Sequence, residues 1–270
     1  MAVKAYLARC LVVVAVCVCA AGVQARTVTE ELKTAPTKNN PVFFEVPDNF
    51  DAAKPIHVVV YFHGDFEDET FEHVVVRQRL AEQVAGANMN AVLVAPYFGD
   101  VVVSNVGTFG DEDGFSAFMC EAFRHLSVLA RTPVQTFAHA PIALIAYSGG
   151  YGPAKALFQN NADIESVLLL DAHYGPQKVF VDKAVEVAKS KRGVFVSAYS
   201  QDTNYRAQQF TDQLSEIGMS FERSVPDAFA PGMIVQQFVQ GKDIHFDFVT
   251  KAWAENPITD FLKKTYTARP

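Results

Sequence analysis

The chain has 270 residues, 50% of them hydrophobic, which is enough to bury the core of one sizeable domain. Its formal net charge of −7 disfavours nucleic acid and anionic membrane surfaces as partners. Of the four cysteines, only Cys120 lies beyond the first 25 residues, so we expect no intramolecular disulfide after that segment and a packed, unreactive thiol.

Residues 1–25 have the composition of a secretory signal peptide. Basic Lys4 and Arg9 precede an apolar stretch at 11–21, and the small side chain of Ala25 predicts cleavage after it. The apolar stretch is shorter than the roughly 20 residues that a membrane-spanning helix needs. We therefore expect a secreted or periplasmic protein without stable membrane insertion, and an uncleaved anchor is the alternative.

The rest of the chain alternates predicted strands and helices. Residues 26–40 are polar and predict a flexible segment, and the domain then spans 41–270, beginning with a proline-bounded edge strand at 41–47. We see no internal repeat and no linker that would divide this domain. The later strands are expected at 57–62, 91–96, 142–147, 166–171, 193–199 and 233–239. The helices are expected at 68–86, 115–130, 177–190 and 205–217, and a terminal helix follows His245.

Most of these predicted strands are apolar without interruption. Such strands are buried on both faces, which is typical of a largely parallel sheet covered by helices. The sequence therefore predicts the α/β class, a three-layer sandwich with a mostly parallel central sheet and helices on both faces.

A serine followed by two glycines ends the strand at 142–147. This pattern is typical of a nucleophile elbow, a strained strand-to-helix turn that projects the serine hydroxyl above the sheet. Small neighbours such as Gly149 and Gly150 let the strand and the helix pack closely. The usual pattern is Gly-x-Ser-x-Gly, and this chain has Ala146 at the first position. We therefore predict Ser148 as a nucleophile on a variant elbow.

The candidate catalytic groups share one edge of the predicted sheet. In an open parallel sheet, sites form beyond the carboxyl ends of the strands, where Ser148, Asp171, Asp202 and His245 all lie. A serine hydroxyl needs an imidazole to accept its proton, and the imidazole needs a carboxylate to fix its tautomer. We predict His245 as this base. His173 is the rival, but it shares a short loop with Asp171.

Two carboxylates compete for the acid position. Asp171 follows a run of leucines, where an unpaired buried carboxylate would be costly, so a partner such as His245 is implied. Asp202 lies among polar residues, where water can solvate it. We favour Asp171 and keep Asp202 as the alternative acid.

The oxyanion of acyl transfer needs preorganised donors. These are usually the amide after the nucleophile and a second amide from the loop after an early strand. Gly149 supplies the first amide. The loop that contains His63 and Gly64 supplies the second, from Asp65 or Phe66, and we expect His63 to hold this turn.

With these features, the chain resembles the α/β-hydrolase family from about Pro41 to Thr265. The resemblance implies a Ser-His-Asp hydrolase that cleaves an ester, an amide or a related acyl bond through an acyl-enzyme intermediate. It implies a small-molecule or acyl substrate and neither a metal nor an organic cofactor. The residues that carry it are Phe62-His63-Gly64, Ala146-Tyr147-Ser148-Gly149-Gly150, Leu170-Asp171 and Ile244-His245.

Two other functions fit parts of the pattern. A non-catalytic exported binding protein on the same scaffold predicts that Ser148 is buried or that His245 points elsewhere. A metal hydrolase is the third interpretation, although the spacing of its ligands matches no metal motif. Those ligands would be His63, Asp65, Asp68 and His173.

Two loops, at 98–114 and 220–232, are expected to border the substrate pocket. Phe109, Tyr151 and Tyr174 would give this pocket apolar walls. The connections between the predicted elements leave no room for a large inserted lid. This pattern favours a small, accessible ester over a long lipid.

Overall fold

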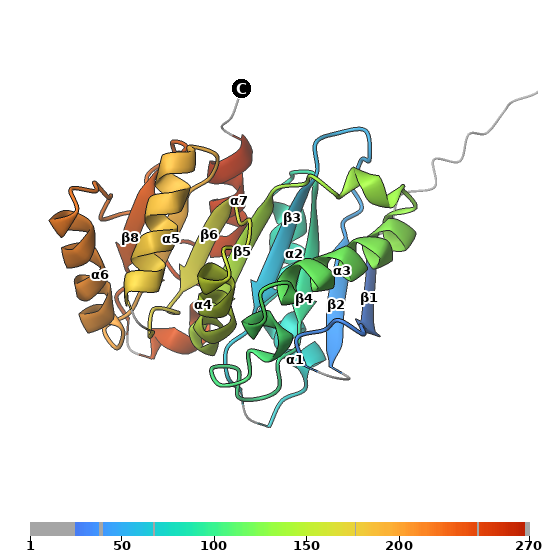
Figure 1. Cartoon of the computed structure of the whole chain (residues 1–270), viewed down its shortest axis with the longest axis horizontal. Coiled ribbons are helices and arrows are strands. Elements are labelled where there is room, and N and C mark those ends of the chain that lie inside the picture. Colours follow the sequence, from blue (N-terminus) through green and yellow to red (C-terminus); the bar gives the residue numbers. More distant parts are fainter. Residues whose placement is uncertain (1–24, 38–39, 67, 176, 242, 268–270) are drawn as a thin grey trace, which may run out of the picture.

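A central sheet organises the computed structural model, which describes residues 25–270 except 38–39, 67, 176, 242 and 268–270. Within these residues the sheet has eight strands in the order β1-β2-β4-β3-β5-β6-β7-β8 (Figure 1). The pairs β1–β2 and β2–β4 are antiparallel, and all later pairs are parallel. The strands are β1 (Arg26–Glu31), β2 (Pro41–Val46), β3 (His57–Phe62), β4 (Ala91–Pro96), β5 (Ile142–Tyr147), β6 (Ser166–Leu170), β7 (Phe195–Tyr199) and β8 (Ile234–Phe238).

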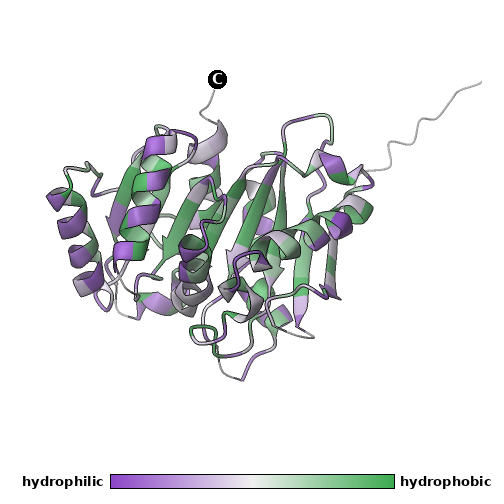
Figure 2. Ribbon diagram, viewed as in Figure 1, coloured by the Kyte–Doolittle hydropathy of each residue, from purple (hydrophilic) through white to green (hydrophobic). Residues whose placement is uncertain are grey.

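Helices cover both faces of the sheet, as predicted. On β3, Val58, Val60 and Phe62 enter the core under α3 to α6, whereas Val59 and Tyr61 enter the core under α1, α2 and α7. Successive side chains of a strand point to opposite faces, so a strand between two helical layers has to be apolar throughout. Figure 2 shows the apolar strands between helices whose outer sides are polar. The helices are α1 (Phe71–Arg77), α2 (Leu80–Gly86), α3 (Gly114–Ala130), α4 (Tyr151–Gln159), α5 (Gln177–Ser190), α6 (Asn204–Glu216) and α7 (Pro257–Leu262).

The helix predicted at 68–86 is two helices. α1 ends at Arg77 and α2 begins at Leu80, because Arg79 between them has a φ of 54°, in the left-handed region. The terminal helix predicted after His245 is α7. His245 itself lies in a 3-10 turn, Ile244–Asp247, and nine residues separate this turn from α7.

The beginning of the described chain differs from the prediction of a flexible segment at 26–40. Arg26–Glu31 forms β1, which pairs along its whole length with β2, so β2 is not an edge strand. The side chains of β1 alternate between exposed and partly exposed. A polar edge strand with no buried face carries no hydrophobic alternation, which is why its sequence resembles a coil.

Cys120 is exposed, and the prediction of a packed thiol is therefore wrong. Helix α3 buries a stripe that includes Phe115, Phe118, Met119 and Ala122. Cys120 follows Met119, and one step along a helix rotates a side chain by about 100°, which takes it out of the buried stripe.

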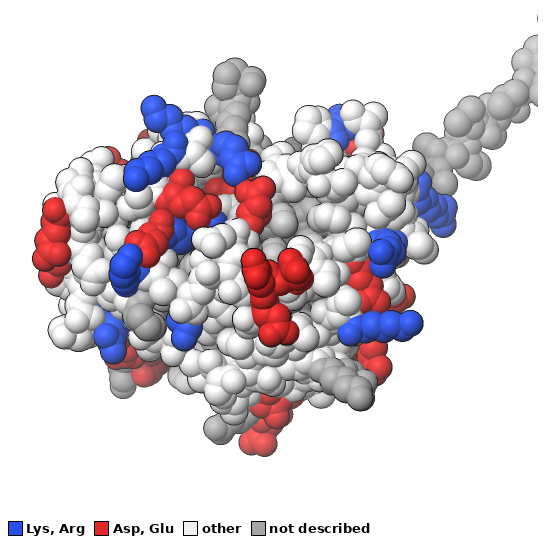
Figure 3. Space-filling model, in the orientation of Figure 1, with Lys and Arg blue, Asp and Glu red and all other residues white. Residues whose placement is uncertain are grey.

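The surface carries charges of both signs. On the face shown in Figure 3, Lys and Arg side chains lie among Asp and Glu side chains, with uncharged surface between them. None of the helices in the described part of the chain is long and apolar enough to cross a membrane.

Candidate active site

The candidate nucleophile stands at a sharp turn between β5 and α4. Ser148 has a φ of 48°, in the left-handed region that few residues other than glycine adopt. A Cβ added to Gly150 would lie 2.7 Å from the carbonyl oxygen of Phe62, and one added to Gly149 would lie 2.4 Å from Asp65 Oδ1. The two glycines therefore let the turn approach the loop after β3 closely, as an elbow requires.

Ser148, His245 and Asp171 lie in hydrogen-bonding contact. The Oγ atom of Ser148 is 2.9 Å from Nε2 of His245, and Nδ1 of His245 is 2.6 Å from Oδ2 of Asp171. An imidazole protonated at Nδ1 donates to the carboxylate and accepts the serine O–H at Nε2, which is the arrangement of a catalytic triad. Ser148 is partly exposed, and 24% of the His245 side chain is accessible, so the non-catalytic interpretation fails both of its structural predictions.

Asp171 is fully buried but well supplied with donors. Its carboxylate accepts hydrogen bonds from the Ser200 N–H at 2.9 Å, the Ser200 hydroxyl at 2.9 Å and the Thr203 hydroxyl, besides His245. Burial alone would raise the pKa of Asp171, but the hydrogen bonds from His245, Thr203 and Ser200 outweigh it and hold this pKa below its ordinary value. The carboxylate is therefore ionised at neutral pH.

The rival residues lie elsewhere. Asp202 is exposed, and its backbone N–H donates to the Ser200 hydroxyl at 3.2 Å, so its carboxylate is not the partner of His245. His173 is fully buried, with Nδ1 3.3 Å from the Ser197 hydroxyl, and burial lowers its pKa to about 3. A histidine in that position is a neutral core residue.

Two backbone amides lie close to each other at the serine turn. Gly149 is the second residue of the 3-10 turn Ser148–Gly150, and an N–H at the start of a helix precedes the first intrahelical bond. A Cβ on Gly149 would lie 3.2 Å from the backbone nitrogen of Asp65, so the two amides are neighbours. The Phe66 N–H donates to the Asp100 carbonyl instead, which leaves Asp65 as the second candidate donor.

The side chain of Asp65 is directed to another loop. Its Oδ1 accepts a hydrogen bond from the Val102 N–H at 2.6 Å, and the Val103 N–H lies 3.4 Å away. Asp65 thus ties the loop after β4 to the loop after β3. This contact gives a structural role to an aspartate beside the candidate oxyanion site, since its carboxylate is bonded to backbone amides of the loop after β4.

His63 also connects the loop after β3 to the loop after β4. It is fully buried, with Nδ1 2.8 Å from the Gly64 carbonyl, and its Nε2 accepts a hydrogen bond from the Phe98 N–H at 3.1 Å. Burial lowers its pKa to about 4, so it is a neutral structural residue. His63 and His173 lie in separate aromatic clusters, and the described residues contain no group of three or more His, Cys, Asp or Glu that could hold a metal ion.

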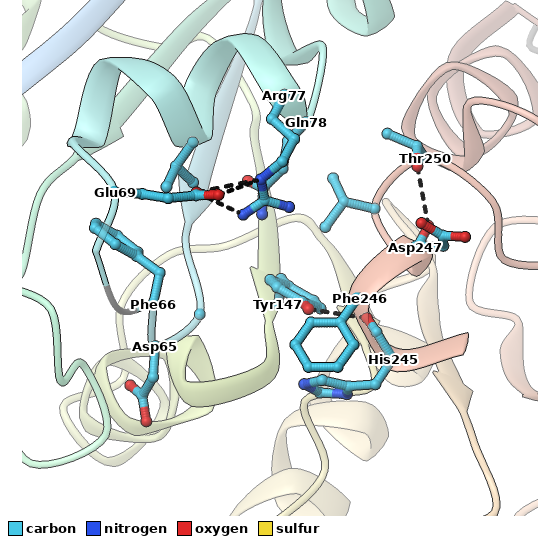
Figure 4. A pocket seen from close by; sticks show the side chains of 13 residues that line it. Asp65, Phe66, Glu69, Arg77, Gln78, Tyr147, His245, Phe246, Asp247 and Thr250 are labelled. Atoms are coloured by element: carbon cyan, nitrogen blue, oxygen red, sulfur yellow. Dashed lines mark hydrogen bonds and ion pairs between the residues drawn. The ribbon is translucent and has the colours of Figure 1, made fainter. Parts of the chain in front are cut away.

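A cavity of about 450 Å³ opens beside His245. Figure 4 shows it between the end of α1 on one side and the turn that follows β8 on the other. Tyr147 lies between these two walls, and its hydroxyl donates to the His245 carbonyl at 2.9 Å. The lining side chains include Asp65, Phe66, Glu69, Val74, Arg77, Gln78, Tyr147, His245, Phe246, Asp247, Val249 and Thr250.

This cavity differs from the pocket that the sequence predicted. Phe109 is fully buried in the core and forms no wall, whereas Tyr151 and Tyr174 are partly exposed, with ring centroids 5.6 Å apart. Sequence reasoning missed the contributions of α1 and of the turn after His245. It also missed Ser200 as a partner of Asp171, although both follow the ends of adjacent predicted strands.

Comparisons with known proteins give a fold and no sequence family. No protein-family model and no curated protein sequence matches the chain. A feruloyl esterase module from Clostridium thermocellum is similar in structure, with a TM-score of 0.54, 14% identity and coverage of 89% of each chain. An S-formylglutathione hydrolase from Agrobacterium tumefaciens has a TM-score of 0.51 and 12% identity, and the match covers 88% of this chain and 93% of the other. The likeness confirms the predicted α/β-hydrolase fold.

Proposed function

We propose that this chain is a serine hydrolase that cleaves a carboxylic ester of a small molecule. The observation that carries the proposal is the unbroken contact from the Ser148 hydroxyl through His245 to the buried carboxylate of Asp171, at 2.9 and 2.6 Å. The feruloyl esterase module and the S-formylglutathione hydrolase have a similar fold, and the names of both refer to acyl compounds. This supports an acyl bond as the target. An amide is the less favoured target, because no feature of the site is specific to a leaving amine.

The reaction follows from the positions of the protons. His245 takes the proton of Ser148 at Nε2 while Oγ attacks the ester carbonyl carbon, and the amides of Gly149 and Asp65 bind the resulting oxyanion. The imidazolium then gives this proton to the leaving alcohol, and an acyl-enzyme remains. A water molecule that is deprotonated by the same Nε2 releases the acid. Asp171 stays ionised and stabilises the imidazolium in both steps.

A fluorophosphonate probe tests the activated serine without knowledge of the substrate. We expect the wild type to be labelled and both Ser148→Ala and His245→Ala to lose the label, because the nucleophile or its base is removed. Ser224→Ala, at an exposed serine outside the site, is the matched control and should keep the label. A folded wild type that resists the probe would overturn the hydrolase proposal and favour a binding protein on the same scaffold.

Export is a second proposal, and the supporting evidence is the composition of residues 1–25, nearly all of which lie outside the described structure. Cleavage after Ala25 would leave β1 intact, because that strand begins at Arg26. Secretion in a bacterial host followed by sequencing of the N-terminus tests this. A protein that begins at Arg26 outside the cytoplasm supports cleavage, and an intact N-terminus on a membrane-bound protein supports the anchor.

A further inference from the structure

We propose that the alcohol portion of the ester is a neutral, hydroxyl-rich group such as a sugar, held between the Glu69–Arg77 ion pair and Phe246. This inference rests on the proposed function, because it assigns the cavity to the leaving group of that reaction. His245 must protonate the leaving oxygen, so the alcohol has to lie on the side of the serine where His245 stands. The cavity of about 450 Å³ is on that side, and small-molecule sites commonly measure roughly 300 to 1,000 Å³.

The wall formed by the chain around α1 offers donors and acceptors together. Arg77 Nε lies 3.1 Å from Glu69 Oε1, and Arg77 Nη2 lies 3.0 Å from Glu69 Oε2. A guanidinium has five N–H donors in a fixed fork, so this pair leaves donors of Arg77 and lone pairs of Glu69 for a ligand. The Arg77 side chain is 45% exposed and that of Glu69 is 30% exposed. A hydroxyl group both donates and accepts, and it can therefore satisfy both partners at once.

The opposite wall has an aromatic face that core packing does not explain. Phe246 is 73% exposed, and its ring centroid lies 6.0 Å from that of His245 at the cavity. A large exposed aromatic beside a polar cavity is a typical contact for the apolar C–H face of a ring whose edges carry hydroxyls. Asp247, the next residue, adds a carboxylate acceptor to this wall.

The charges of the lining argue against the other classes of alcohol. Glu69 and Arg77 neutralise each other, and in Figure 4 the carboxylate of Asp65 points away from that pair. Asp247 then leaves the cavity slightly negative, which disfavours an anionic alcohol. A quaternary ammonium group can neither donate to Glu69 nor accept from Arg77, so it would leave both partners without a hydrogen bond from the ligand. A long alkyl alcohol would cover the ion pair without replacing the water bonded to it, which is costly. A neutral polyol can hydrogen-bond to the Glu69–Arg77 pair and can pack its C–H face on Phe246.

Matched esters test the inference. The purified full-length protein is assayed with 6-O-acetylglucose, hexyl acetate and acetylcholine, which share one acyl group and differ in the alcohol. We expect kcat/KM to be at least tenfold higher for acetylglucose. Arg77→Ala and Phe246→Ala should lower kcat/KM for acetylglucose at least tenfold more than for hexyl acetate, mainly through KM. Arg192→Ala removes an exposed ion pair to Asp163 outside the cavity and should leave this ratio unchanged.

The outcomes separate the two proposals, because every variant is also labelled with the fluorophosphonate probe. Labelling of Ser148 together with a preference for hexyl acetate or acetylcholine overturns the sugar inference alone. The same holds if Arg77→Ala and Phe246→Ala leave the ratio unchanged, or if the labelled enzyme hydrolyses none of the three esters. Loss of labelling in the folded wild type overturns the proposed function itself.

Discussion

Two buried carboxylates in this molecule have opposite protonation properties. Asp171, at the end of β6, is fully buried and accepts hydrogen bonds from His245, Ser200 and Thr203, and its pKa is lowered. Glu45, near the end of β2, is 2% exposed, and its Oε2 has no hydrogen-bond partner among the described residues. Burial and the nearby charge of Asp48 raise the pKa of Glu45 to about 8. Burial therefore does not decide the charge of a carboxylate, whereas the donors around it do.

The two residues also make opposite contributions to stability. The folded pKa of Asp171 lies below its ordinary value of 3.8, so its ionised form stabilises the fold above that pH and the benefit is lost as pH falls. The folded pKa of Glu45 lies above its ordinary value of 4.5. The unfolded chain ionises first, and Glu45 therefore lowers the free energy of unfolding progressively from about pH 4.5 to pH 8.

Removal of the charge of Asp171 should have the largest effect on activity. In Asp171→Asn the donors Ser200 N–H and Thr203 hydroxyl hold the amide oxygen at the Oδ1 position, so the amide N–H₂ faces Nδ1 and donates to it. His245 is then held with its proton on Nε2, where it cannot accept the serine proton. We expect kcat on an activated ester such as p-nitrophenyl acetate to fall by about 10³- to 10⁴-fold. Asp202→Asn changes an exposed carboxylate one loop away and should leave kcat within about twofold. The opposite ranking of the two variants would give the acid role to Asp202.

The same kind of substitution at Glu45 should change stability instead. Glu45→Gln keeps the shape and removes the titration, so the free energy of unfolding should rise relative to wild type between pH 4 and pH 8. A difference of about 3.5 in pKa corresponds to roughly 5 kcal/mol at most, and we expect about 2–4 kcal/mol at pH 8. Urea unfolding at pH 4, 6 and 8 measures this. Glu31→Gln, at an exposed site in β1, is the control, and parallel curves for Glu45→Gln and wild type would contradict the prediction.

The contrast between Asp171 and Glu45 also shows what the sequence can predict. Asp171 follows one apolar run, and Ser148 and His245 follow two others. This placement was enough to predict that the three residues meet at one edge of the sheet. The donors to Asp171 were not predicted, because they depend on the register that sets Leu170 beside Ala198 in β6 and β7. That register brings the start of the Ser200 loop to the carboxylate.

Other features depend on contacts between distant segments. The cavity joins α1 to the turn after β8, and no local pattern links segments so far apart in the chain. The break between α1 and α2 at Arg79 was not predicted, because the apolar spacing continues across it. The positive φ of Arg79 does not change this spacing. Sequence patterns thus predicted the strands buried between two helical layers well and the polar β1 poorly.

The donors of Asp171 can be weakened one at a time. Thr203→Val removes a fully buried hydroxyl that donates to the carboxylate and keeps the shape of the side chain. We expect the pKa of Asp171 to rise and kcat to fall by roughly tenfold. The loss of stability in acid should also begin at a higher pH than in wild type. Thr211→Val is the control, since it removes a buried hydroxyl that donates to the Gln208 carbonyl. It should leave kcat unchanged, and it should not change the pH at which stability begins to fall in acid.

The smallest expected effect concerns the other side of His245, where Tyr147 donates to the histidine's own carbonyl at 2.9 Å. Asp171 fixes the ring of His245, and Tyr147 fixes the backbone that carries it, so Tyr147 is a positioning residue. Tyr147→Phe should lower kcat by about three- to tenfold with little change in KM, because the bond orients the base rather than the substrate. Tyr61→Phe is matched, since it removes a buried hydroxyl 2.7 Å from Gln78 Oε1. If both variants lose similar stability and kcat falls only in Tyr147→Phe, the hydrogen bond from Tyr147 positions the base. If the two variants have equal kcat, this hydrogen bond has a structural role alone.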